Sequence, residues 1–163
     1  MIHIRLIQSF LVGAVALFAL LVAFNNIVDY QSNFNFVVHV LTMDTTFPDN
    51  ALMSRAITAD WAHHGAYWII IGFEIATGLL CATGCVRMLS ASGSSKAAFR
   101  ESKTLASWGL ATGILLWFTG FMTVGAEWFL MWQSEQWNGQ QPGFRFVMIL
   151  FAVLIFLHQS EPD

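Results

Sequence analysis

Four long apolar segments constrain the fold of this chain more than any other feature of its sequence. They cover residues 6–24, 65–89, 105–126 and 144–157. A hydrocarbon core of about 30 Å needs about 20 apolar residues, each rising about 1.5 Å along a helix. The fourth segment is the shortest, and Arg145 near its start can extend to the membrane interface. With an extra turn at their ends, the segments predict spans at residues 6–28, 64–89, 104–126 and 142–159.

The composition argues against a soluble domain and against a nucleic-acid-binding protein. Hydrophobic residues make up 56% of the 163 residues and charged residues 10%, whereas soluble domains average about 45–50% and about 25%. A soluble fold would expose apolar patches far above the few hundred Å² that monomers tolerate. The net charge of −3 offers no basic field for nucleic acid. We therefore expect a single-domain, all-α, integral membrane four-helix bundle whose main partner is the lipid bilayer.

The positions of lysine and arginine predict the orientation, because these residues collect in cytoplasmic loops. Five of the seven lie before the first span or around the loop between the second and third spans: Arg5, Arg87, Lys96, Arg100 and Lys103. The other two loops carry Arg55 and Arg145. Both termini are expected in the cytoplasm, and residues 29–62 are expected to form an extracytoplasmic loop.

That long loop has a helical pattern of its own. Within residues 33–44, apolar side chains fall near one helical face: Phe36, Val37, Val40, Leu41 and Met43. This pattern predicts a short amphipathic helix that lies on the membrane surface or on the bundle. Pro48 marks a turn after it. The loop is therefore expected to be partly helical.

One acidic residue, Glu74, lies inside the second apolar segment. At 100° per residue, one narrow stripe of this helix carries nearly all its chemistry: Asp60, His63, Tyr67, Ile71, Glu74, Gly78, Cys81 and Cys85, with His64 at its edge. Glu74 follows His64 by ten residues, which is about 15 Å and places it near the bilayer midplane. Because burial disfavours the charged form, we expect a neutral Glu74 that donates a hydrogen bond to a carbonyl or hydroxyl.

The third segment predicts a complementary face. Ala106, Gly109, Gly113, Trp117, Gly120, Val124 and Glu127 align on one side. Small residues four apart let two helix backbones approach closely. The stripe of the second span is therefore expected to pack on this face, with Gly78, Gly109, Gly113 and Gly120 as packing residues. Glu74 would then face protein near Thr112, Thr119 or Thr123, and His63 or His64 would lie level with Glu127.

Candidate ligand-binding residues follow from this arrangement: His39, His64, Tyr67, Glu74 and Glu127. An acid within a span can act in a ligand site, in a proton or ion path, or as a polar clamp between helices. The alternatives for a bound ligand are a quinone, a lipid or haem b. We find no hydrolase, metalloprotease or phosphate-loop motif. The chain is therefore expected to be non-enzymatic, with no catalytic residues, no metal site and no required cofactor.

Three pieces of the sequence carry a family resemblance. They are "FNNIVDYQSNFNFVVHVLTMDTTFP", then Arg55, then "HHGAYWIIIGFE". The chain resembles the bacterial "predicted small integral membrane protein" family, a domain-of-unknown-function group. The matching positions are Asn26, Asp29 and Tyr30; Phe36, Val37, His39, Val40, Met43 and Asp44; and His64, Tyr67 and Glu74. The resemblance implies four transmembrane helices in the bacterial inner membrane, and it implies no reaction.

Two functions remain open from the sequence. The segments outside the spans are too small for a catalytic domain, which favours an accessory or assembly subunit of a larger respiratory or photosynthetic membrane complex. The alternative is a binding module that holds a quinone, lipid or haem on the face of His64, Tyr67 and Glu74. A transporter is less favoured, because one intramembrane acid without an inverted repeat makes a poor pathway.

Overall fold

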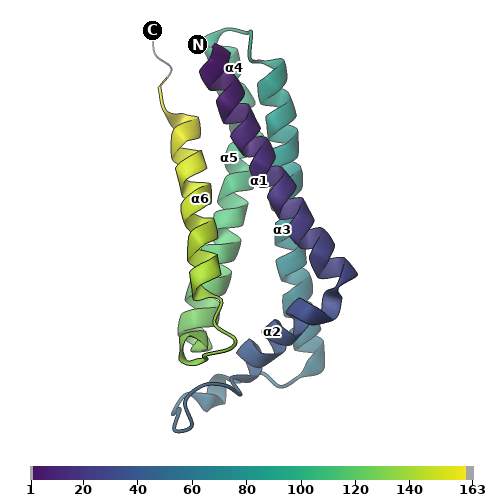
Figure 1. Ribbon diagram of the computed structural model, residues 1–163, viewed down its shortest axis with the longest axis vertical. Helices are drawn as coiled ribbons and strands as arrows, with labels where there is room; N and C mark the ends of the chain where they lie inside the picture. The colour runs from purple at the N-terminus through teal and green to yellow at the C-terminus, as the bar shows by residue number, and fades with distance from the viewer. Residues whose placement is uncertain (1, 161–163) are drawn as a thin grey trace.

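The computed structural model describes residues 2–160 as an all-α chain, without a strand in that range (Figure 1). The main helices are α1 (Ile2–Val28), α2 (Tyr30–Thr42), α3 (Asp60–Ser90), α4 (Lys96–Ser102), α5 (Thr104–Ile114), the π-helical η2 (Leu115–Trp128) and α6 (Gln140–His158). Two short 3₁₀ turns are η1 (Met53–Arg55) and η3 (Met131–Gln133). Four helices are long and apolar enough to cross a membrane, namely α1, α3, the run Lys96–Trp128 and α6. The predicted all-α, four-span fold is confirmed.

The helices form a bundle with two different ends. Figure 1 shows α4 beside the start of α1 at one end, with α2 crossing the other. We call these the α4 end and the α2 end. Helix α3 packs mainly against α1 and α5, whereas α6 packs mainly against α5 and η2. Towards the α2 end, the pair α1 and α3 diverges from η2 and α6 (Figure 1).

Small residues allow α3 to approach two neighbours on different faces. A Cβ atom on Gly78 would lie 2.5 Å from Cγ of Leu20, so Gly78 faces α1 and not the third span. On the other face, Gly109 lies against Cys81, and Gly113 lies against Thr77. The second span thus packs on the glycine face of the third, as the sequence predicts. This packing covers the half of the bundle nearer the α4 end.

The predicted face of the third span is wrong beyond Trp117, because the helix changes its geometry. From Leu115 the backbone follows i→i−5 hydrogen bonding, and the amide of Phe129 donates to the carbonyl of Val124 at 3.0 Å. Each residue then turns by a different angle from the 100° assumed for an α-helix. Gly120, Val124 and Glu127 are all exposed as a result. A Cβ atom on Gly120 would lie 3.8 Å from Cδ1 of Leu116, a residue of the same helix.

The helix expected in the long loop is α2. Its buried side chains are Phe34, Val37, Val40 and Leu41. Phe36 is half-buried, and Met43 is buried just after the helix, where it adopts the left-handed conformation with φ of 55°. The following segment is tied back to α2, because the amide of Ile57 donates to the carbonyl of Leu41 at 2.8 Å. Helix α2 is therefore packed on the bundle.

Buried polar side chains close the α4 end. The guanidinium of Arg5 donates to the carbonyls of Ser92 and Ser94 at 3.0 and 2.6 Å. It also lies over the ring of Phe99, 4.7 Å from its centre. Gln8 donates through Nε2 to the carbonyl of Phe156 at 2.8 Å. These contacts tie the start of α1 to the loop after α3 and to the end of α6.

The substitution Arg5→Gln is expected to lower the free energy of unfolding by about 2–3 kcal/mol, because the buried side chain of Arg5 loses two charged hydrogen bonds to the carbonyls of Ser92 and Ser94. The measurement is denaturant-induced unfolding in mild detergent, followed by circular dichroism. Arg87→Gln is the matched control, since Arg87 is exposed in the last turn of α3. The control should change stability by less than about 1 kcal/mol. Equal losses in the two variants would contradict a specific role for Arg5.

Candidate functional site

Glu74 is hydrogen-bonded to the first span. Nδ2 of Asn26 lies 3.0 Å from Oε1 and 2.8 Å from Oε2 of Glu74. Both side chains are buried, with 4% of Asn26 and 2% of Glu74 exposed. The carboxyl group therefore accepts hydrogen bonds in these contacts, where a donation to a carbonyl or hydroxyl was expected. Two threonines of the third span that were expected near Glu74 form other hydrogen bonds. Thr112 donates to the carbonyl of Trp108, and Thr123 donates to the carbonyl of Phe118.

Two further side chains extend this pair into a network. Nδ2 of Asn33 donates to Oδ1 of Asn26 at 2.6 Å. The hydroxyl of Tyr67 donates to the backbone carbonyl of Asn26 at 3.2 Å. Asn26 thus contacts Glu74, Asn33 and Tyr67 at once. We call these four residues the Asn26–Glu74 cluster.

The cluster lies where the last turn of α1 meets the middle of α3. Asn26 is in the last turn of α1 and follows the apolar segment that ends at residue 24. Glu74 and Asn26 also line a cavity together with Gly139 and Gly143, at the start of α6. Glu74 lies near the middle of α3, which has 31 residues, and its place near the bilayer midplane stays a prediction. A helix of that length spans about 46 Å and extends well beyond a hydrocarbon core of about 30 Å.

An aromatic group lies next to the cluster. The hydroxyl of Tyr30 lies 2.8 Å from Nδ1 of His64, and the rings of Phe34 and His64 stack with centres 4.2 Å apart. Tyr30 also meets Tyr67 edge to face at 4.7 Å. Burial, and secondarily the nearby carboxylate of Asp60, raise the pKa of Tyr30. Tyr30 therefore keeps its proton at neutral pH, and its hydroxyl shares a hydrogen bond with Nδ1 of His64.

Two cavities adjoin the cluster at the α2 end. One, of about 240 Å³, is lined by all four cluster residues and by the rings of Trp117, Phe121 and Phe146. The other, of about 230 Å³, is almost entirely apolar and lies among α2, α3 and η2, with Gly120 in its lining. Phe36, Val37, Ile70 and Phe121 line both cavities. Polar groups at one wall and rings at the others suit a small molecule with a flat, hydrogen-bonding head.

The structure separates the five predicted ligand-binding residues. Tyr67 and Glu74 line the 240 Å³ cavity, and His64 lies one contact away through Tyr30. His39 instead pairs with Asp44, 2.8 Å from Nδ1 to Oδ2, and stacks on Trp137. Glu127 is exposed at the end of η2 and is not part of the cluster. His63, expected near Glu127, bonds through Nε2 to the carbonyl of Ile57 at 2.8 Å.

No group of three or more His, Cys, Asp or Glu side chains that could hold a metal ion occurs in residues 2–160. The two cysteines, Cys81 and Cys85, are free thiols of which Cys81 is buried.

Sequence reasoning placed Asn26 in the family pattern but gave it no role, and it missed Asn33 and the aromatic cavity walls. One signal was present, because Asn26 is a polar residue just after the apolar segment that ends at residue 24. The aromatic walls come from η2 and α6, and only the change to π geometry sets which side chains of η2 face inward.

The chain was compared with known proteins. The family model described as "Predicted small integral membrane protein (DUF2165)" matches residues 4–160. No curated protein matches the sequence, and no solved structure matches it.

Proposed function

The chain belongs to the family of predicted small integral membrane proteins, and from this premise we propose that it is a non-enzymatic protein that binds a quinone head group beside Glu74. One observation carries the proposal. A buried carboxyl–amide pair forms one wall of a 240 Å³ cavity whose other walls include three aromatic rings. Small-molecule sites typically combine apolar walls with a few polar groups that fix orientation.

The chemistry of the cavity suits a quinone ring. The amide of Asn33 and the hydroxyl of Tyr67 are hydrogen-bond donors that can turn towards a carbonyl oxygen. Trp117 and Phe146 offer flat faces, with ring centres 5.2 Å apart. The adjoining apolar cavity offers room for the first part of a hydrocarbon tail. A lipid head group is the alternative occupant, and haem would require His64 to give up its bond to Tyr30.

The substitution Asn33→Leu is expected to weaken binding of a short-chain quinone about three- to tenfold, because one hydrogen bond is lost. The measurement is equilibrium titration of the purified chain in detergent, combined with organic extraction and mass spectrometry of molecules that copurify. Asn35→Leu is the matched control, since Asn35 is exposed on the same helix and does not line the cavity. Equal affinity of both variants, or copurification of phospholipid without quinone, would contradict the quinone assignment.

A second proposal is that the chain serves as an accessory subunit of a larger membrane complex. What supports it is a continuous exposed stripe along α6, formed by Phe144, Met148, Phe151 and Ile155. This stripe suits lateral packing against another membrane protein as well as against lipid. Extraction in mild detergent followed by native mass measurement tests it. A lone species of 18.2 kDa would contradict the accessory role.

We also propose the bacterial inner membrane as its location, with the α4 end in the cytoplasm. The support is the concentration of lysine and arginine at that end. Reporter fusions after Ser160 and within the segment of residues 45–58 test the orientation. Cytoplasmic activity of the second fusion would contradict it.

A further inference from the structure

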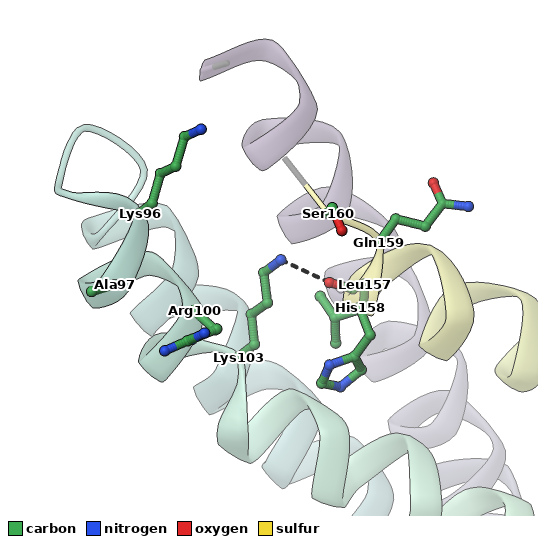
Figure 2. A pocket seen from close by; sticks show the side chains of 8 residues that line it. All are labelled: Lys96, Ala97, Arg100, Lys103, Leu157, His158, Gln159 and Ser160. Carbon is green, nitrogen blue, oxygen red and sulfur yellow. Dashed lines mark hydrogen bonds between the residues drawn. The ribbon is translucent and has the colours of Figure 1, made fainter. Parts of the chain in front are cut away.

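The apolar cavity of about 230 Å³ continues the space beside the Asn26–Glu74 cluster. None of its thirteen lining residues carries a polar side chain. It adjoins the 240 Å³ cavity at Phe36 and Phe121, whose rings stack with centres 6.0 Å apart and line both cavities. The largest cavity, of about 490 Å³, is different, because it lies at the α4 end and six of its eight lining residues are polar or charged (Figure 2). The apolar cavity therefore suits a hydrocarbon chain attached to a head group beside Glu74.

The chain covers the apolar cavity at the α2 end. Leu41, Phe129 and Met131 line it there, and at most 9% of each is exposed. The segments that follow α2 and η2 are tied to each other at this end, since the hydroxyl of Thr45 donates to Oγ of Ser134 at 2.8 Å. These contacts separate the cavity from the water beyond the spans.

The exposed part of the cavity lining faces sideways, between α3 and η2. Ile69 of α3 is 63% exposed, and Val124 of η2 is 43% exposed. Gly120 is exposed between them, and a Cβ atom there would meet only Cδ1 of Leu116 within 4 Å. All of these residues belong to helices that are long and apolar enough to cross a membrane. The open side of the cavity therefore faces lipid, and it carries no side chain at Gly120.

A second apolar groove, of about 270 Å³, lies between α1 and α6 and is the alternative path for a hydrocarbon chain. It shares one lining residue with the 240 Å³ cavity, Phe146, whereas the apolar cavity shares four. The ring centre of Phe146 lies 4.8 Å from that of Phe18 and 5.2 Å from that of Trp117. These packed rings stand between the groove and the cluster, which favours the path between α3 and η2.

We propose that the tail of the bound quinone runs through the apolar cavity and leaves the bundle between α3 and η2, so that the ligand is a membrane-dissolved quinone with a prenyl tail. This inference rests on the proposed function, because it concerns the tail of the same ligand. Lipid and cavity are both apolar, so transfer of the tail between them gives little hydrophobic energy. The fit of the tail at its exit therefore decides binding, and Gly120 keeps that exit open.

The test is equilibrium titration of the purified full chain in one detergent, with two probes. One probe is a tailless dimethoxybenzoquinone, and the other is the same ring with a prenyl tail. Gly120→Leu places a side chain in the exit and is expected to weaken binding of the prenylated probe about tenfold, with the tailless probe unchanged. Val124→Phe narrows the same exit and is expected to act in the same direction. Because one detergent is used throughout, the partition of each probe is the same for every variant.

Ala14→Leu is the matched control, since Ala14 is exposed on α1 and lines the groove between α1 and α6. It adds a leucine side chain to the alternative path and is expected to change the affinity of neither probe. A loss confined to the prenylated probe in Gly120→Leu and Val124→Phe would support the proposal. Unchanged binding of the tailless probe by these variants also shows that they are folded.

Three results would overturn the tail path and leave the head-group site intact. They are unchanged binding of the prenylated probe by Gly120→Leu, equal weakening of both probes by that variant, and selective loss of the prenylated probe in Ala14→Leu. A different result would overturn the proposed function, and the tail path with it. That result is failure of the unmodified chain to bind the tailless probe.

Discussion

Replacing Gly84 with alanine is expected to destabilise the bundle by about 2–3 kcal/mol, with a fall in melting temperature on the order of 5–10 °C. A Cβ atom at Gly84 would lie 2.5 Å from the backbone nitrogen and 2.7 Å from Cα of Ala106. These are main-chain atoms of α5, so no side-chain rotation can relieve the overlap. The helices must move apart, and the packing of α3 on α5 must be lost over several residues.

Gly72→Ala is the matched control for this prediction. Gly72 lies on the same helix, α3, and a Cβ atom there would meet nothing within 4 Å. Because alanine favours a helix over glycine by about 1 kcal/mol, the control is expected to be neutral or stabilising. Thermal unfolding in detergent, followed by circular dichroism, measures both variants. Similar melting temperatures for the two would show that α3 and α5 do not approach as closely as described.

The second large effect is expected at Asn26. The substitution Asn26→Leu leaves the carboxyl group of Glu74 buried without its described partner, which should cost about 3 kcal/mol or more. Glu74→Gln should be mild, at about 1 kcal/mol or less, because its amide oxygen still accepts a bond from Asn26. Asn25→Leu, at an exposed position of the same helix turn, should be nearly neutral.

A double-mutant cycle makes this prediction specific. The variant with both Asn26→Leu and Glu74→Leu removes donor and acceptor together and should be more stable than Asn26→Leu alone by about 2 kcal/mol. The free energy of unfolding in detergent is the quantity compared. If the two losses simply add, the contact between Asn26 and Glu74 contributes nothing, and the description of the cluster is wrong.

The polar residues of the first and second spans illustrate how much of the site the sequence could predict. The stripe on α3 correctly placed Tyr67 and Glu74 on an inward face, because an α-helix turns by a constant 100° per residue. The stripe did not indicate which helix packs on that face or which side chain bonds to Glu74. Asn26 lies 48 residues away in the chain, and only the antiparallel packing of α1 on α3 brings its amide to Glu74.

The third span shows a different limit of prediction from the sequence. Its first half follows the predicted pattern, with Ala106, Gly109 and Gly113 buried against neighbours. Its second half does not, because i→i−5 hydrogen bonding in η2 rotates Gly120 and Val124 into exposed positions. The apolar residues of this segment are equally compatible with either geometry. Local composition therefore could not indicate where the change occurs.

The sequence by itself determined that the chain is all-α with four helices capable of spanning a membrane, because backbone groups in lipid must be satisfied within each segment. It also determined the amphipathic helix α2, through the spacing of its apolar side chains. Only the tertiary structure decided that Glu74 bonds to Asn26, that the cluster lies near the α2 end, and that an apolar cavity among α2, α3 and η2 adjoins it. Hydrophobicity acts segment by segment, whereas hydrogen bonds and cavities depend on the relative shift and rotation of helices distant in the chain.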